Sequence, residues 1–181
     1  VMVIGDSHAR MWFPTYIKLA QERDLTLAIS AAPNCPWQGR FDLEDTGVFP
    51  GEHQQIEDCK KMKRDLYDRV IPELEPDLII CSGDLTTFGF KQEYLLAREY
   101  LDRLNCDRMV VIPGNHDSRN VGYIHFEEFF GERHSVLRME EITVVAVDSS
   151  EPDLDHGHIG RARYSWIEEQ FAGPADFGIF V

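Results

Sequence analysis

Six short and almost uninterrupted apolar runs constrain the fold of this chain more than any other feature of its sequence. They cover residues 1–4, 25–29, 77–81, 108–112, 142–147 and 177–181. Runs of this kind are typical of strands buried on both faces, as in a parallel sheet covered by helices. Helical patterns lie between them, at residues 11–23, 61–71, 91–105, 123–130 and 161–171. Strands that alternate with helices predict a layered α/β/α fold with a mostly parallel central sheet.

The length and charge of the chain narrow its class. Its 181 residues predict one α/β domain over 1–181, with a substantial core. Residues 32–57 predict a long surface loop. The net charge of −14 would repel a phosphate backbone, so nucleic acid is not expected as a partner in bulk. No apolar run approaches the roughly 20 residues that cross a bilayer, so no membrane segment is expected in the chain. The sequence leaves the oligomeric state open.

The ends of the chain and its cysteines suggest how the protein could be processed and in which cellular compartment it could fold. Both ends fall inside strand-like runs, so we expect a chain truncated at both ends, with a targeting segment able to lie upstream. Cys35 and Cys59 flank a loop rich in Pro, Gly and acidic residues, and an exported protein could pair them. Cys81 and Cys106 lie in or beside predicted core elements and are expected to be buried thiols.

Polar groups follow four of the predicted strands. In open α/β sheets, ligands bind beyond the carboxyl ends of the strands, which meet at one edge. Topology alone is therefore expected to gather a set of polar side chains there. The set comprises Asp6, Ser7, His8, Asp84, Asn115, His116 and Asp148.

The donor types in this set suit a metal centre. Carboxylate, imidazole and amide groups are a mixture that binds Mn, Fe or Zn. Asp6 and His8 lie two residues apart, and Asp84 has two oxygens with which to bridge two divalent ions. Asn115 offers a neutral carbonyl oxygen. His116 could protonate a leaving-group oxygen as a general acid.

The motifs that carry these residues resemble a known family. Gly-Asp-Leu-Thr-Thr-Phe-Gly at 83–89, Gly-Asn-His-Asp at 114–117 and the segment 144–171 resemble the calcineurin-like metallophosphoesterases, over about residues 76–181. Asp6-x-His8 fits the opening motif of that family. The resemblance implies that Asp6, His8 and Asp84 hold one ion and that Asp84 and Asn115 hold the other. It implies hydrolysis of a small phosphoester, by a phosphodiesterase or a phosphatase, with His116 over the scissile phosphate. The family's later His-containing segments are not found, so the site is expected to be incomplete toward the C-terminus.

The first 80 residues support a second interpretation. They resemble the SGNH hydrolase-like domain of bacterial acyltransferases, in which the serine of Gly-Asp-Ser, here Ser7, is the nucleophile. A chimeric chain, with an SGNH-like segment 1–75 and a metallophosphoesterase-like segment 76–181, would explain both resemblances. Asp84 argues against an esterase, since a carboxylate at that position repels a developing oxyanion. Esterase or acyltransferase activity through Ser7 and a non-catalytic relic remain the alternatives.

Two further expectations concern the surface and the compartment. The acidic run at residues 151–155 predicts a solvated loop. Its Asp153-x-x-His156 pattern matches a hydrolase triad only by spacing, and we read it as a coincidence. The phosphoesterase-like part favours the cytoplasm, whereas pairing of Cys35 with Cys59 would favour an extracytoplasmic location.

Overall fold

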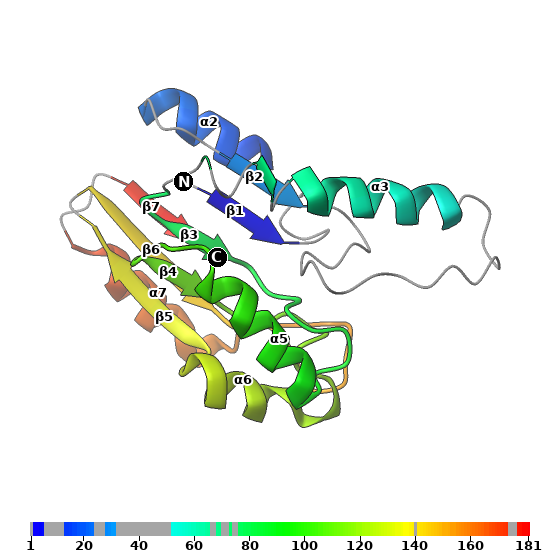
Figure 1. Cartoon of the computed structure of the whole chain (residues 1–181). Coiled ribbons are helices and arrows are strands. Elements are labelled where there is room, and N and C mark those ends of the chain that lie inside the picture. Colours follow the sequence, from blue (N-terminus) through cyan, green and yellow to red (C-terminus); the bar gives the residue numbers. More distant parts are fainter. Residues whose placement is uncertain are drawn as a thin grey trace. The chain divides into compact units, whose positions relative to one another are not determined.

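Figure 1 shows the computed structural model of the chain, which comprises two compact units. It describes residues 2–5, 13–23, 28–31, 52–65, 68–69, 73, 76–139, 141–173 and 177–181. The first unit contains residues 1–80 and 96–107, and the second contains residues 81–95 and 108–181. Strand β3 (Ile79–Cys81) and helix α5 (Lys91–Asp102) each contribute residues to both units.

The first unit is built on parallel strands. Strands β1 (Met2–Gly5) and β2 (Ala28–Ala31) pair in parallel, in register from Met2 with Ala28 to Gly5 with Ala31. Strand β3 (Ile79–Cys81) lies next to β1 and is fully buried. The helices of this unit are α2 (Phe13–Arg23), α3 (Glu52–Asp65) and most of α5 (Lys91–Asp102). A buried continuous run of apolar residues places β3 in the core, as the sequence predicts.

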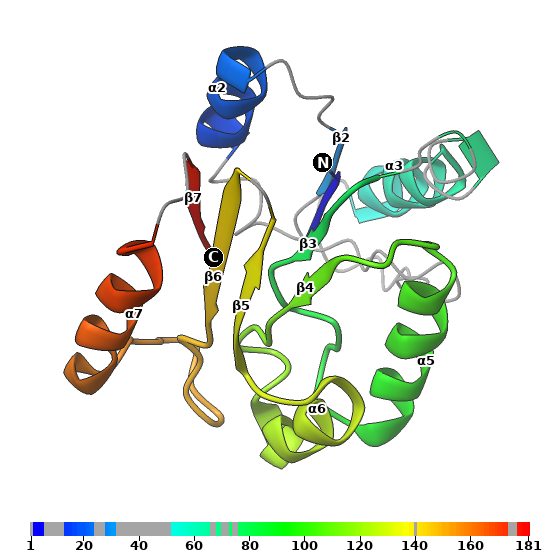
Figure 2. The same ribbon diagram turned by 90° about the vertical axis from the view of Figure 1, so that its left-hand side faces the viewer.

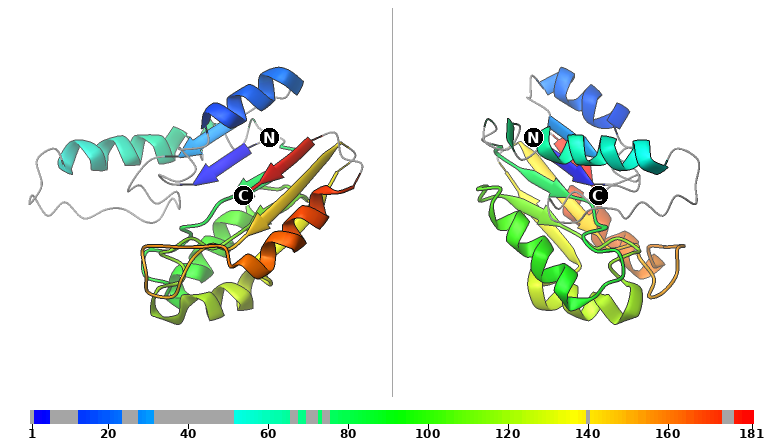
Figure 3. Two further views of the ribbon diagram at one scale, coloured as in Figure 1. Left: turned by 180° about the vertical axis from the view of Figure 1, so that it is seen from behind. Right: turned by 45° about the vertical axis from the view of Figure 1, so that its right-hand side comes forward.

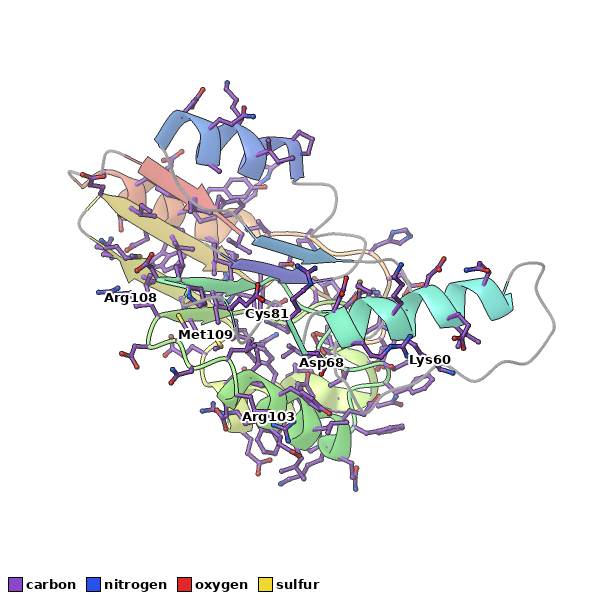
Figure 4. All side chains as sticks on the ribbon, turned by 45° about the horizontal axis from the view of Figure 1, so that its top comes forward. Lys60, Asp68, Cys81, Arg103, Arg108 and Met109 are labelled. Carbon is purple, nitrogen blue, oxygen red and sulfur yellow. The ribbon has the colours of Figure 1, made fainter. Side chains whose placement is uncertain are left out.

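The second unit begins where β3 ends. Strand β4 (Met109–Val111) runs beside the end of β3, since the Ile112 amide donates to the Cys81 carbonyl at 3.1 Å. Figure 4 labels Cys81 and Met109 at this place. A separate sheet has the order β5-β6-β7, with β5 (His134–Arg138), β6 (Ile142–Val147) and β7 (Phe177–Phe180). Strands β5 and β6 are antiparallel, whereas β6 and β7 are parallel.

Helix α7 (Tyr164–Phe171) covers the second sheet and is preceded by the short helix η3 (Arg161–Arg163). Figures 2 and 3 show α7 running along β6 and β7. Gly178 makes close packing possible, because a Cβ there would lie 2.7 Å from the Phe171 ring. Strand β6 is buried along most of its length, which explains its uninterrupted apolar sequence.

An aromatic cluster joins the start of α5 to helix α6 (Gly122–Phe130), which follows the short helix η2 (Arg119–Val121). The Tyr94 ring stacks on Phe129 at 6.2 Å and meets Phe126 edge-on at 6.4 Å. Tyr94 and Phe126 are fully buried. The Tyr94 hydroxyl donates to the Asp117 carbonyl at 2.8 Å, so this cluster anchors the loop that follows β4. Burial raises the pKa of Tyr94, which keeps the hydroxyl protonated as a donor.

The predicted fold class is confirmed, with two local corrections. Helix α3 begins at Glu52 rather than near residue 61, so residues 52–57 are helical where a surface loop was predicted. Among its described side chains, Ile56 and Cys59 are buried, three positions apart on one face, and this short apolar stripe is hard to see in a polar sequence. Strand β5 was not predicted, because most of its residues are only half-buried and its apolar run is short.

The structure separates the described cysteines by their bonding. Cys59 forms a disulfide, whereas Cys81 and Cys106 lie outside any disulfide. Cys81 is buried, and the half-buried Cys106 donates from Sγ to the Pro76 carbonyl at 3.1 Å. Cys35 lies outside the described residues. Among the helices that the structure describes, none is long and apolar enough to span a membrane.

Candidate active site

Three of the predicted site residues come together in the second unit. Asp84 lies on the loop after β3, and Asn115 and His116 lie on the loop after β4. The His116 amide donates to Asp84 Oδ1 at 3.2 Å. Asp6, Ser7 and His8 lie outside the described residues. The predicted convergence therefore holds for Asp84, Asn115 and His116.

Two glycines allow the backbones of these loops to touch. Gly83 has φ +102°, and a Cβ on it would lie 2.4 Å from the Gly114 nitrogen. A Cβ on Gly114 would lie 2.2 Å from Asp84 Oδ1. Asp84 itself has φ 52°, in the left-handed region that non-glycine residues seldom adopt. Strain of this kind persists only where surrounding contacts hold it, and it is frequent at functional sites.

Asp117 ties the two loops together. It is fully buried. Its Oδ1 accepts the Thr86 amide and hydroxyl, both at 2.8 Å, and its Oδ2 accepts the amides of Leu85 at 3.1 Å and Gly114 at 2.8 Å. Burial raises the pKa of Asp117 to about 6, against the opposing effect of these four donors. One buried carboxyl group thus fixes the backbone on both sides of Asp84.

Glu93 holds the rest of the first loop. It is the third residue of α5, where a carboxylate can cap the free N–H groups at a helix start. Its Oε1 accepts the Thr87 amide at 3.0 Å, and its Oε2 accepts the amides of Phe88 at 3.1 Å and Phe90 at 3.0 Å. Together Asp117 and Glu93 accept hydrogen bonds from the backbone amides of residues 85–88 and of residue 90.

His116 is oriented through one ring nitrogen. Its Nδ1 lies 2.9 Å from the Thr87 carbonyl oxygen and 3.1 Å from Arg119 Nη1. The carbonyl accepts when Nδ1 carries a proton, and the guanidinium donates when it does not. Either way Nδ1 is engaged, so proton transfer to or from a substrate falls to Nε2. The role of His116 as a general acid stays a prediction, and it would use Nε2.

The carboxylate of Asp155 contacts the segment that follows β4. Asp155 Oδ1 accepts Asn115 Nδ2 at 3.3 Å and Arg119 Nη2 at 2.7 Å. The Arg119 guanidinium holds the pKa of Asp155 below its usual range. Since the Asn115 amide nitrogen is used here, its carbonyl oxygen is the atom left to bind a ligand.

Asp148 serves a different purpose from the other predicted site residues. It is buried. Arg133 Nη1 donates to its Oδ2 at 2.8 Å, and Ser150 donates to its Oδ1 from the backbone at 2.7 Å. These contacts hold the turn after β6, and the paired guanidinium offsets the cost of burying the carboxylate.

The described residues include two of the predicted metal ligands, Asp84 and Asn115. Among the described residues, no group of three or more His, Cys, Asp and Glu is arranged to hold a metal ion. Asp84 and Asn115 contribute oxygen donors of the kind that divalent cations accept. The Asp84 backbone is strained, and the Asn115 amide nitrogen is already hydrogen-bonded to Asp155. Both observations fit a role of these two side chains as metal ligands. The other predicted ligands, Asp6 and His8, belong to the undescribed part of the chain.

The sequence did not predict the structural roles of two carboxylates, Asp117 and Asp155. Asp117 stands inside the Gly-Asn-His-Asp motif, and its buried position after a strand is the signal that could have marked it as the organiser of the loops. Asp155 lies in the predicted solvated loop and is indeed exposed. Its contacts reach 36 and 40 residues along the chain, so no local pattern reveals them.

Comparison with known proteins identifies the family of this fold and site. A family model described as calcineurin-like phosphoesterase matches residues 1–177. The chain therefore belongs to the calcineurin-like phosphoesterase family, whose members generally use a dinuclear metal centre. The match also runs through residues 1–75, and it lends no support to the SGNH hydrolase-like resemblance of that segment.

Individual relatives are phosphodiesterases by name. A probable glycerophosphodiester phosphodiesterase of Arcobacter nitrofigilis is 37% identical over 101 residues, covering 53% of this chain and 37% of the relative. A probable cyclic nucleotide phosphodiesterase of Synechococcus is 28% identical over 102 residues, covering 55% of this chain and 39% of the relative. One from Rhodococcus erythropolis is 25% identical over 147 residues, covering 77% and 49%. The matched part of the chain thus spans less than half the length of each of these relatives.

Proposed function

We propose that the protein hydrolyses a small phosphodiester at the site formed by Asp84, Asn115 and His116. The observation that carries this proposal is the direct contact between the two loops, in which the His116 amide binds the Asp84 carboxylate. Family membership supports phosphoester chemistry. The names of the relatives, which include glycerophosphodiester and cyclic nucleotide phosphodiesterases, favour a diester over a monoester.

The residues divide the work between binding charge and moving a proton. Asp84 and Asn115, with Asp6 and His8, would hold two divalent ions, Mn, Fe or Zn. Such ions, when bound, neutralise the charge of a phosphate and provide a nucleophile at neutral pH. His116 Nε2 donates a proton to the leaving oxygen while Nδ1 stays held at the Thr87 carbonyl. Arg119 Nη1 lies beside His116 Nδ1, while Arg119 Nη2 is paired with Asp155.

The test is hydrolysis of bis(p-nitrophenyl) phosphate with Mn or Zn added to the metal-free protein. We expect Asp84→Ala to abolish the metal-stimulated rate. The matched control is Asp153→Asn, which changes the charge of an acidic loop residue but keeps an acceptor for the Asn120 amide. It should leave the rate within about twofold. An Asp84→Ala variant with an unchanged metal-stimulated rate contradicts the proposal.

A second comparison isolates the general acid. His116→Ala should slow the reaction by about 10²- to 10⁴-fold for a substrate with a poorly acidic alkyl leaving group. The loss should be smaller with p-nitrophenolate, which leaves without protonation. Equal losses for both substrates would show that His116 acts in some other way. Metal-independent cleavage of an aryl acetate that Ser7→Ala abolishes would instead favour the esterase alternative.

Two broader features of the chain fit this proposal. The family match runs through both compact units, which supports one domain over 1–181 in place of separate segments 1–75 and 76–181. The disulfide at Cys59 supports an extracytoplasmic location, where disulfides persist. Alkylation of the protein without reductant, followed by mass measurement, should leave Cys59 unmodified. A modified Cys59 in freshly purified protein would favour the cytoplasm.

A further inference from the structure

We infer that Asp155 is a positioning residue for Asn115, which it holds with the amide nitrogen turned away from the cation and the carbonyl oxygen available to it. The inference deepens the proposed function and rests on it. It assigns a role in the candidate site to an exposed residue of the acidic loop at 151–155.

The geometry shows one carboxylate oxygen serving two partners. Asp155 Oδ1 accepts Asn115 Nδ2 at 3.3 Å and Arg119 Nη2 at 2.7 Å. The other guanidinium nitrogen, Arg119 Nη1, lies 3.1 Å from His116 Nδ1. Asp155 therefore reaches the predicted metal ligand directly and the predicted general acid through Arg119.

The loop that carries Asp155 is itself held in place. Leu154 donates its amide to the Glu151 carbonyl at 3.2 Å, which closes a tight turn. Asp153 adopts φ 59° within this turn, and its Oδ1 accepts the Asn120 amide at 2.7 Å. Two carboxylates of one loop thus bind the segment from residue 115 to residue 120. A loop held at two points can present Asp155 at a defined place despite its exposure.

The chemistry of an amide explains why such a group is needed. An amide side chain can turn over, exchanging its oxygen acceptor for an NH₂ donor at the same place. A cation binds the oxygen and is repelled by the NH₂ group. With Asp155 present, the reversed orientation would bring the Asn115 oxygen against a carboxylate oxygen. The carboxylate therefore selects the orientation that can bind a metal, as outer partners of metal ligands commonly do.

The test measures metal binding without turnover. Calorimetric titration of the metal-free chain with Mn should show that Asp155→Ala binds about 10- to 100-fold more weakly than wild type. Asp155→Asn should recover most of the affinity, to within about threefold, because its amide oxygen still accepts from Asn115 Nδ2. Two controls are matched: Glu168→Gln, on the exposed side of α7, for the lost charge, and Leu154→Ala, in the same loop, for the truncation. Both should bind Mn as wild type does.

A second readout observes the amide itself. In the ¹⁵N-labelled, metal-free protein, the side-chain NH₂ signals of Asn115, assigned through Asn115→Asp, should shift in Asp155→Ala and stay in place in Leu154→Ala. If Asp155→Ala binds Mn within twofold of wild type while Asp84→Ala loses binding, the role of Asp155 is wrong and the proposed function stands. If wild type binds no Mn and Asp84→Ala changes nothing, both fall. Circular dichroism confirms that every variant is folded.

Discussion

Asp117→Asn is the sharpest perturbation of the loops that carry the candidate site. The substitution keeps the shape of the side chain and exchanges one carboxylate oxygen for an NH₂ group. Each Asp117 oxygen accepts two hydrogen bonds. Whichever way the new amide turns, two of the four buried donors lose their acceptor. A buried donor left unsatisfied costs about 1–3 kcal/mol, so the pair costs about 4 kcal/mol.

The lost charge acts in the opposite direction. Burial raises the pKa of Asp117 from 3.8 to about 6, so keeping the group ionised in the fold costs about 3 kcal/mol above pH 6. The uncharged variant avoids that cost. We therefore expect the free energy of unfolding to fall by only about 1 kcal/mol at pH 7.5.

The pH dependence distinguishes this account from a simple loss of packing. A carboxyl group whose pKa is raised on folding binds its proton more tightly in the native state. Its contribution to stability is full below pH 3.8 and is lost as the pH rises through about 6. Between pH 7.5 and pH 5 the wild type regains about 1 kcal/mol from Asp117, which the variant cannot. The difference between the two proteins should therefore widen to about 2 kcal/mol at pH 5.

Urea unfolding followed by tryptophan fluorescence, with a chelator present, measures this difference at both pH values. Comparing two proteins at the same pH cancels the titration of every other group. Asp153→Asn is the control, because an exposed carboxylate replaced by an amide should show no such change. A difference that is constant with pH, or larger at pH 7.5, would refute the reasoning.

Three further substitutions test how the loops are held. Gly114→Ala places a methyl group 2.2 Å from Asp84 Oδ1 and should lower the unfolding free energy by about 2–4 kcal/mol in urea. Tyr94→Phe removes the 2.8 Å bond to the Asp117 carbonyl and should cost about 1–2 kcal/mol, seen as a lower Tm. Glu93→Ala frees three loop amides and should speed their hydrogen exchange at least tenfold. Wild-type values in any of these would show that the contact concerned does not stabilise the loop.

Much of the candidate site could be predicted because its residues follow buried strands. Asp84 comes after the buried β3, and Asn115 and His116 come after β4, so strand polarity alone predicts that they meet at one edge. The glycines beside them were visible as well. The close approach of Gly83 to Gly114 could not be predicted, because it depends on where the two loops pass in space rather than on the sequence of either loop.

The features missed by sequence reasoning depend on long-range contacts or weak patterns. Asp155 acts on residues 36 and 40 positions away, and an acidic loop at the surface gives no local sign of that. Strand β5 is stabilised by pairing with β6, although its own residues are mostly half-buried. Among the described side chains of helix α3, the buried ones form a narrow stripe, and the polar residues around them at 52–57 suggested a loop.

The most direct test of the central claim is to locate the metal. Crystals of the chain grown with Zn and measured at the Zn absorption edge show each bound ion in an anomalous difference map. The account predicts an ion within about 2.0–2.2 Å of an Asp84 carboxylate oxygen, with a second ion bound by Asp84 and the Asn115 carbonyl oxygen. Zinc bound elsewhere, with Asp84 and Asn115 left free, would contradict it.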